Sequence, residues 1–236
     1  DNPGHGASHS DFESKIIAGN TFDFSYTHGK AIKENGFSFC SVSDESIING
    51  HVDLTGYKMV DFIFGEEKKT SAPKYKNKID FEVFPGALRE KITNYLNNGG
   101  KIFLSGSYIG TDLYSETDSI GIRFANEVLK FKLKTGHAVK IGNVFSVNNN
   151  FLTLKSTIEF NTTFNDSIYK VEAPDELGSV KGSEVLLRYS ENNFSAAVGY
   201  KEKYGVVSFG FPFETIMGEK QRNILMKSVL NYLDIK

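Results

Sequence analysis

Short apolar runs alternate with amphipathic segments along most of the chain. The runs at 57–64, 101–104 and 205–210 are bounded by turn-forming or acidic residues, as is typical of buried strands in a parallel sheet. Apolar residues recur at helical spacing after Pro85 and again over 222–233, which predicts a helix at each place. Strands that alternate with helices predict an α/β protein with right-handed crossovers between parallel strands.

The pattern changes between residues 131 and 200. Apolar residues there lie among Asn, Thr and Ser in short alternating runs, and two of these runs flank Asn192-Asn193 at hairpin spacing. We therefore expect one α/β domain over 1–236 with a β-rich elaboration over 131–200 inside it. The remaining expected elements are a helix within 21–35, a strand over 37–42, a short turn or helix over 44–49 and a helix over 122–129.

A glycine-flanked turn follows the run 101–104. Residues 97–100 are Asn-Asn-Gly-Gly, which tolerate left-handed backbone and end the preceding helix. Gly106 and Gly110 then bracket Tyr108 in the frame of a nucleophile elbow, in which small flanking residues leave one side chain exposed above the sheet. The sequence thus places Tyr108 where α/β hydrolytic enzymes hold their nucleophile.

Composition limits the classes of partner. The 236 residues are 39% hydrophobic, which supports a sizeable core, and the net charge of -2 gives no reason to expect nucleic acid or an anionic membrane as partner. The single cysteine, Cys40, excludes an internal disulfide and a cysteine-cluster metal site, and we expect it to be buried and inert. No apolar stretch is long enough to span a bilayer. Because the sequence begins with Asp1, we expect a mature form or an excised domain of a longer chain.

Several segments together resemble one family. A buried strand ending in Gly-Glu-Glu at 65–67, the glycine pair at 99–100, the run 102–112 and the late run 207–214 are similar to class I glutamine amidotransferase-like (flavodoxin-like) domains of secreted bacterial proteins, many of which are labelled xanthan lyase. The run 17–31 resembles the same group. The resemblance covers most of the chain and implies a three-layer flavodoxin-like sheet with a β-rich insertion. It also implies a secreted, periplasmic or cell-surface protein linked to polysaccharide.

The same resemblance argues against amidotransferase chemistry. The family holds a Cys nucleophile at the elbow, where this chain has Tyr108. The family also has a His followed by Pro-Glu after a late strand, where this chain has Phe-Pro-Phe-Glu at 211–214. A phenol and a phenyl ring cannot supply a thiolate–imidazole pair, so we expect the scaffold without glutamine hydrolysis.

Candidate catalytic residues lie where the parallel strands end, which is the edge at which such sheets bind ligands. Glu66 is either an acid, base or sugar-hydroxyl acceptor, or a carboxylate in a solvated turn. Tyr108 fits an acid–base group, a platform for a sugar ring or a plug that closes the pocket. Glu214 follows the last strand, and His28, near the start of the first helix, either faces this edge or is a hydrogen-bonded packing residue.

Four more polar residues are candidates for ligand binding. Ser107 places a hydroxyl on the elbow without a neighbouring His in sequence to activate it. Asp112 lies in the first turn of the next helix, where it most simply complements the positive helix end. Asn20 and Tyr26 add amide and aromatic groups of a kind that suits carbohydrate and is equally common in polar loops.

The sequence predicts neither a metal nor a cofactor. His5 and His9 are four residues apart, but Pro3 and the adjacent glycines argue against a helix there, and zinc signatures are absent. Gly106 and Gly110 lack the spacing of a phosphate-binding loop.

Three functions remain open at this point. The leading hypothesis is a glycan-binding protein in which the amidotransferase catalytic pair has been lost. The first alternative is an active polysaccharide lyase or hydrolase that uses Glu66, Tyr108 and Glu214 with help from His28. The second is a non-catalytic module for protein interaction.

Overall fold

The computed structural model describes residues 24–71, 79–114, 119–147, 151–152, 157–165 and 168–236. Its strands are β1 (Val60–Gly65), β2 (Thr70–Ser71), β3 (Ile79–Phe81), β4 (Lys101–Gly106), β5 (Phe131–Thr135), β6 (Asn143–Ser146), β7 (Ile158–Glu159), β8 (Glu176–Ser179), β9 (Ser183–Tyr189), β10 (Ser195–Lys201) and β11 (Gly205–Phe209). Its α-helices are α2 (Phe24–Glu34), α3 (Asp44–Ile48), α4 (Gly86–Asn97), α5 (Ile109–Leu113), α6 (Ser119–Arg123) and α7 (Glu219–Tyr232). Two 3₁₀ turns, η2 (Leu54–Gly56) and η4 (Phe213–Thr215), and the π-helix η3 (Phe124–Leu129) complete the description.

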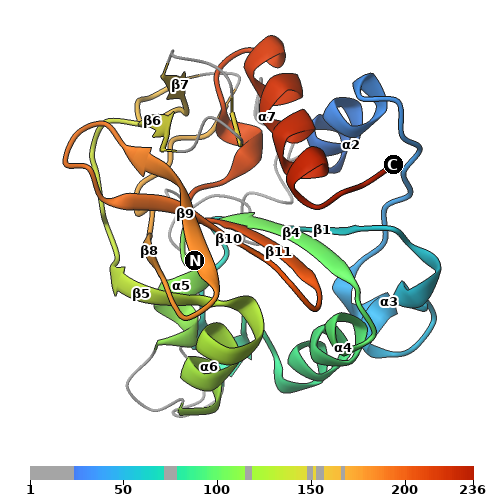
Figure 1. Ribbon diagram of the computed structural model, residues 1–236. Coiled ribbons are helices and arrows are strands. Elements are labelled where there is room, and N and C mark those ends of the chain that lie inside the picture. The colour runs from blue at the N-terminus through green and yellow to red at the C-terminus, as the bar shows by residue number, and fades with distance from the viewer. Residues whose placement is uncertain (1–23, 72–78, 115–118, 148–150, 153–156, 166–167) are drawn as a thin grey trace.

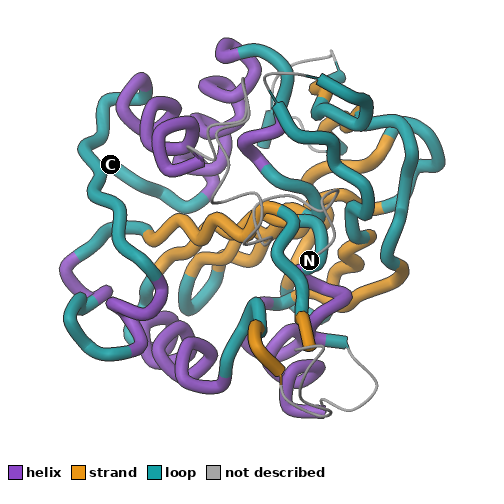
Figure 2. Tube along the Cα trace, turned by 180° about the vertical axis from the view of Figure 1, so that it is seen from behind, coloured by secondary structure: helices purple, strands orange, loops and turns teal. Residues whose placement is uncertain are grey.

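A mixed seven-stranded sheet forms the centre, in the order β1-β4-β11-β10-β9-β6-β7. Strand β4 lies between β1 and β11 and is parallel to both, whereas the strands from β10 to β7 continue the sheet in antiparallel pairs. Figure 1 shows α2 and α7 on one side of the parallel strands and α4 on the other, and Figure 2 shows the same arrangement from behind. The predicted α/β class is therefore confirmed.

The antiparallel half of the sheet curls away from the parallel half, so the sheet is not one flat middle layer. The pairing of β10 with β9 shifts register twice, between Ser195 and Val198. Such bulges bend a strand and increase its twist. The β-rich segment thus supplies strands to the central sheet and also a separate pair, β5-β8.

Alternate residues of the parallel strands face two different apolar clusters. Phe103 of β4 packs with residues of α7 on one face, whereas Ile102 and Leu104 pack with residues of α4 on the other. This alternation follows from the period of two in a strand, and it explains why parallel strands read as continuous apolar runs. Within the described residues, no helix combines the length and apolar character needed to cross a membrane.

The predicted strand over 37–42 is wrong. These residues form irregular chain and are mostly exposed, and the predicted buried thiol of Cys40 is exposed as well. Residues 38–42 line one side of a cavity of about 840 Å³ whose other side is formed by 59–64, at the outer edge of β1. A strand forms only when a neighbour accepts its backbone hydrogen bonds, and no described strand pairs with 37–42.

Most other predicted elements are confirmed with shifts at their ends. The helices within 21–35, over 44–49, after Pro85 and over 222–233 correspond to α2, α3, α4 and α7, and the three apolar runs correspond to β1, β4 and β11. The hairpin around 192–193 joins β9 to β10. The predicted helix over 122–129 is divided between α6 and the π-helix η3.

The end of β11 is fastened to the chain that enters β8. The backbone N–H of Asp175 donates to the carbonyl of Gly210 at 2.7 Å, and the hydroxyl of Tyr189 donates to the carbonyl of Asp175 at 2.9 Å. A Cβ atom on Gly210 would lie 2.2 Å from the carbonyl oxygen of Asp175. Only glycine therefore allows these two backbones to approach so closely.

We expect Gly210→Ala to lower the free energy of unfolding by at least about 2 kcal/mol, because the two backbones must separate to admit the methyl group. Gly86→Ala is the matched control, since a Cβ there meets nothing within 4 Å and the residue begins α4. Its free energy should change by less than about 1 kcal/mol. Urea unfolding measures both, and equal midpoints for the two variants would contradict the expectation.

Candidate functional site

The carboxyl ends of the three parallel strands meet at one edge of the sheet, and each end carries predicted site residues. Glu66 follows β1, Ser107 and Tyr108 follow β4, and Glu214 lies in η4 shortly after β11. Glu66 is 1% exposed and Tyr108 is 9% exposed, while Ser107 and Glu214 are also buried. Polar side chains buried in this way must be hydrogen-bonded or they destabilise the fold, so their partners define the site.

A bulge at the end of β1 sets the direction of Glu66. The pairing with β4 shifts register between Ile63 and Gly65, and Gly65 has a φ of 54°, in the region that favours glycine. Glu66 points inward as a result, and Glu67 lines the cavity beside β1. Two adjacent carboxylates thus reach different surroundings.

The Glu66 carboxyl group is only half satisfied. Its Oε1 atom accepts the backbone N–H of Glu172 at 2.7 Å and the hydroxyl of Ser107 at 3.4 Å. Its Oε2 atom is buried and has no hydrogen-bond partner among the described residues. Burial, with the charges of Glu172 and Glu214, raises the pKa of Glu66 to about 7, although the hydrogen bonds oppose this shift. Near neutral pH the group can therefore donate or accept a proton.

The Tyr108 phenol remains protonated at neutral pH. Burial, together with the charges of Glu66, Glu172 and Asp175, raises its pKa to about 12. The Nζ atom of Lys68 lies 5.5 Å from the centre of the ring. Tyr108 consequently presents a phenolic hydroxyl and a ring face with a cation over it, and it lacks the character of a base.

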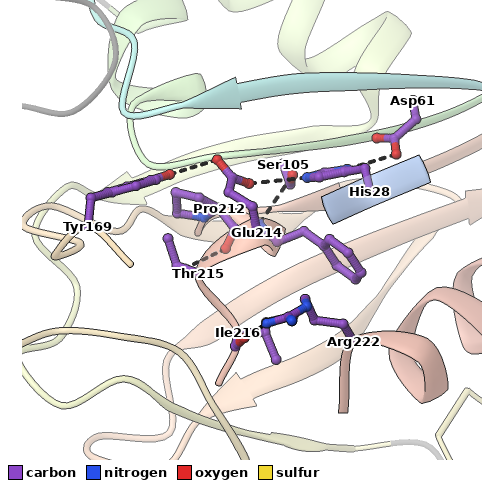
Figure 3. Close-up of polar contacts among 10 residues, drawn as sticks. His28, Asp61, Ser105, Tyr169, Pro212, Glu214, Thr215, Ile216 and Arg222 are labelled. Carbon is purple, nitrogen blue, oxygen red and sulfur yellow. Dashed lines mark hydrogen bonds and ion pairs between the residues drawn. The ribbon is translucent and has the colours of Figure 1, made fainter. Parts of the chain in front are cut away.

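A chain of four buried or half-buried polar side chains runs beside this edge (Figure 3). His28 contacts Asp61 Oδ2 through Nδ1 at 2.8 Å and Glu214 Oε2 through Nε2 at 3.1 Å. The hydroxyl of Tyr169 donates to Glu214 Oε1 at 2.7 Å. Burial by itself would lower the pKa of His28, but the charges of Asp61 and Glu214 and their hydrogen bonds outweigh it and raise the pKa to about 9.

This chain limits what two predicted catalytic residues can do. Both nitrogens of the charged His28 ring hold protons that point at carboxylates, so the ring has no lone pair with which to act as a base. Both oxygens of Glu214 are likewise occupied, by His28 and by Tyr169. The hydrogen-bonded packing interpretation of His28 is thus the one that the geometry supports, and Glu66 is left as the carboxyl group with a buried oxygen that has no partner among the described residues.

Asp112 lies in the first turn of α5, as predicted, and its side chain also binds two remote backbone groups. Its Oδ1 atom accepts the backbone N–H of Lys69 at 2.7 Å, and its Oδ2 atom accepts that of Val83 at 3.3 Å. The side chain therefore ties the elbow to the chain between β1 and α4. The sequence did not predict these two contacts, because the partners are remote in sequence.

The backbone N–H groups in the first turn of α5 bind the side chain of Asp175. Its Oδ2 atom accepts the backbone N–H groups of Gly110 and Thr111 at 2.7 and 3.0 Å, and its Oδ1 atom accepts the Thr111 hydroxyl at 2.6 Å. Burial raises the pKa of Asp175 to about 7 despite these hydrogen bonds. The elbow is thus positioned by the β-rich segment.

Of the two remaining predicted residues, only Tyr26 is described, and it stays outside the cluster. Tyr26 is 58% exposed on α2, and Asn20 lies outside the described residues. The described residues contain no group of three or more His, Cys, Asp or Glu side chains arranged to hold a metal ion. Sequence reasoning missed Asp61, Tyr169 and Asp175, of which only Asp61 left a signal, as a lone carboxylate inside the apolar run 57–64.

Comparison with solved structures finds the same fold in proteins of low sequence identity. The cytoplasmic protein STM3548 from Salmonella typhimurium has a TM-score of 0.56 and 14% identity over 89% of this chain and 86% of its own. A ThuA-like protein from Bacteroides uniformis has a TM-score of 0.52 and 11% identity over 94% and 87% of the two chains. The N-terminal domain of mmIFT52 has a TM-score of 0.50 and 15% identity over 88% of each chain.

These similarities show the fold alone. The ThuA-like protein has a glutamine amidotransferase-like fold, which supports that part of the resemblance. None of the three is described as a xanthan lyase. Comparison with protein-family models finds no match, and comparison with curated proteins finds none.

The raised pKa of His28 predicts a stability that falls with pH. Below the ordinary pKa of 6.5 the ring is charged whether the chain is folded or unfolded, and between 6.5 and about 9 only the folded state keeps the proton. The free energy of unfolding should therefore fall by about 3 kcal/mol across this window. The part above about pH 8 lies largely beyond the titrations of Glu66 and Asp175, because the pKa values of both groups are raised to about 7.

Urea unfolding at several pH values measures this slope in the wild type and in His28→Asn. The slope should be absent from His28→Asn and retained in His51→Asn, which changes an exposed histidine. NMR titration of the wild-type imidazole gives a second measurement that needs no variant. A ring that loses its proton near pH 6.5 would show that Asp61 and Glu214 do not hold the charge.

Proposed function

We propose that this chain binds a carbohydrate at the edge where β1, β4 and β11 end, and that it does not hydrolyse glutamine. We also propose that the chain has a flavodoxin-like, amidotransferase-type scaffold. Its proposed location is secreted, periplasmic or at the cell surface. The observation that carries it is the buried Oε2 atom of Glu66, which has no partner among the described residues. An unsatisfied buried acceptor costs about 1–3 kcal/mol, and a ligand hydroxyl that filled the position would recover this free energy.

The groups around Glu66 suit sugar hydroxyls. A hydroxyl both donates and accepts, and a carboxyl group with a pKa of about 7 can satisfy it in either direction. Ser107 adds a hydroxyl beside the carboxyl group, at 3.4 Å from Oε1. Tyr108, which is 9% exposed, adds a phenolic hydroxyl and an aromatic ring that has the ammonium of Lys68 over it. Small-molecule sites typically combine a small number of convergent polar groups with an aromatic surface.

The same geometry explains why glutamine hydrolysis is not expected. The elbow presents the protonated phenol of Tyr108, which is a poor nucleophile. The single thiol of the chain, Cys40, lies in the irregular segment 37–42 at the outer edge of β1. His28 is occupied by two carboxylates and has no lone pair to activate either group.

A lyase or hydrolase remains the second candidate, and one observation favours it. A carboxyl group with a pKa of about 7 is matched to proton transfer at neutral pH, and Glu66 has that property. Such chemistry also needs a second group within reach of the reacting atoms. Of the predicted partners, Glu214 and His28 are bound to each other, and Tyr108 holds a phenol whose pKa is raised to about 12, so the binding function has the stronger support.

A glycan array followed by calorimetry on the best ligand tests the binding function. We expect Glu66→Gln to weaken binding at least tenfold, because it replaces the open oxygen and its negative charge. Tyr108→Phe should weaken binding by a smaller factor, since the ring face remains. Glu67→Gln is the matched control, because the neighbouring carboxylate lines the cavity beside β1, and its affinity should stay within twofold.

Assaying the same ligand for new reducing ends or unsaturated sugars separates the two candidates. Binding without products supports a binding protein, and products that vanish in Glu66→Gln support the enzyme. If the wild type retains no glycan on the array, the proposal of a carbohydrate ligand is wrong.

A further inference from the structure

The outer edge of β1 is open along its whole length. Among the described strands, only β4 pairs with β1, so the backbone groups on its other side have no strand partner there. The cavity of about 840 Å³ lies beside this edge, and every residue from 59 to 64 lines it. Open strand edges are templates for pairing with further extended chain. The cavity therefore offers the backbone partners that an additional strand needs.

Apolar residues border the cavity from both faces of the sheet. Ile32 of α2 and Leu230 of α7 line it from one face, whereas Ile47 of α3 and Leu54 of η2 line it from the other. Figure 1 shows α2 and α7 on the opposite side of the parallel strands from α3. An extended chain between these layers would be buried on both faces, and strands of this kind are short continuous apolar runs.

The side of the cavity opposite β1 is formed by residues 38–42. Phe39 and Val42 are 47% and 46% exposed there, although both side chains are large and apolar. The segment 37–42 has the sequence pattern of a strand but no described strand beside it. A strand between this segment and β1 would give its backbone a hydrogen-bonding neighbour and would bury apolar surface.

The described chain begins at this cavity. Phe24 is the first residue of α2 and lines the cavity. A Cβ atom on Gly65, the last residue of β1, would lie 3.4 Å from the Phe24 ring. Helix α2 thus begins at the edge where the parallel strands end. Chain that directly precedes Phe24 is tethered at this end of the cavity, which raises its effective concentration there.

Residues 1–23 precede Phe24 and lie outside the described residues. They contain one run of three consecutive apolar residues, Ile16-Ile17-Ala18, which is followed by the turn-forming pair Gly19-Asn20. A short apolar run that ends in such a pair is typical of a buried parallel strand. Residues 21–23 would then connect this strand to α2, and connections of this length are usual between a strand and a helix.

We propose that residues 15–20 occupy the cavity as a strand parallel to β1, between β1 and the segment 37–42. The parallel direction follows because a strand that leads into α2 must end where β1 ends. Six extended residues span about 20 Å, as do the six residues of β1 beside them. A small apolar molecule would leave the backbone groups of β1 unpaired, and the β1 strand of a second copy would have to pass the segment 37–42. The inference does not depend on the proposed ligand.

Hydrogen exchange of the wild-type protein, followed by mass spectrometry, tests the proposal without a variant. Amides of residues 15–20 should exchange at least about a hundredfold more slowly than in a synthetic peptide of residues 11–23, because pairing with β1 protects them. Amides of residues 59–64 should be protected as well. The protection should be the same at low and high protein concentration, because both strands belong to one chain.

Cross-linking to the single thiol of the chain locates the segment. Cys40 lies on the side of the cavity opposite β1. Cysteine introduced at each of residues 15–19 in turn should form a disulfide with Cys40 at one or two positions, because paired strands bring Cβ atoms within about 5.5 Å. Phe12→Cys is the matched control, since residue 12 precedes the proposed strand, and it should form no disulfide.

Substitutions measure the contribution of the apolar run. Ile17→Asp should speed the exchange of residues 59–64 at least about tenfold, because a buried carboxylate opposes docking of the strand. Phe12→Asp introduces the same charge outside the proposed strand and should leave this exchange unchanged. If Ile17→Asp prevents folding, the wild-type exchange and the cross-links decide the question.

Three results would overturn the inference. The first is exchange of residues 15–20 at the rate of the free peptide, and the second is protection of these residues without a cross-link to Cys40. The third is protection of residues 59–64 that rises with protein concentration, which would show that a second copy pairs with β1. Slow exchange that is independent of concentration, together with a cross-link to Cys40, would support the proposed strand.

Discussion

The buried imidazolium of His28 connects four separate parts of the chain. It lies on α2 and contacts Asp61 on β1 and Glu214 in η4, and Glu214 then receives the hydroxyl of Tyr169 from the β-rich segment. Removing charges from water costs several kcal/mol per ion, and the attraction repays this cost only when the geometry is good. Loss of one partner would leave a buried charge uncompensated, which typically costs about 3–5 kcal/mol. The network therefore holds α2 and the β-rich segment against the parallel strands.

The same network determines which carboxyl group is available at the edge of the sheet. Glu214 is paired with His28 and has both oxygens hydrogen-bonded, whereas Glu66 keeps one oxygen without a partner in the described part of the chain. The β-rich segment completes this arrangement, because it supplies the backbone N–H of Glu172 to Glu66 and the carboxylate of Asp175 to α5. The β-rich segment, which is antiparallel, thus supplies contacts to one side of the candidate site.

Local sequence patterns predict the parallel core well and the site only in part. The apolar runs and helical spacings locate β1, β4, β11, α4 and α7. A strand buried on both faces, or a helix buried on one face, has a characteristic pattern of apolar residues among its sequence neighbours. The segment 37–42 has the local pattern of a strand but lacks a described partner, which no local pattern can reveal. The position of Glu66 follows from its place after a strand.

The bond between Tyr169 and Glu214 joins residues that are 45 apart in the chain and follow no motif. Long-range hydrogen bonds of this kind come from the tertiary fold, and so do the pKa shifts that they produce. The sequence therefore predicts that His28 and Glu214 lie near the edge where the parallel strands end. It does not predict that they bind each other.

The bulge at Gly65 determines which of the two glutamates that follow it points inward. Successive side chains along an extended chain point to opposite sides, so one inserted residue exchanges inside and outside for everything that follows. At the end of β1 this exchange falls on two glutamates in tandem, and it sends Glu66 inward and Glu67 to the cavity. A chain one residue shorter at this point would keep the same composition of charges and turn the other glutamate toward the elbow. The number of residues between Ile63 and Glu66 thus matters as much as their identity, because it decides which glutamate faces the site.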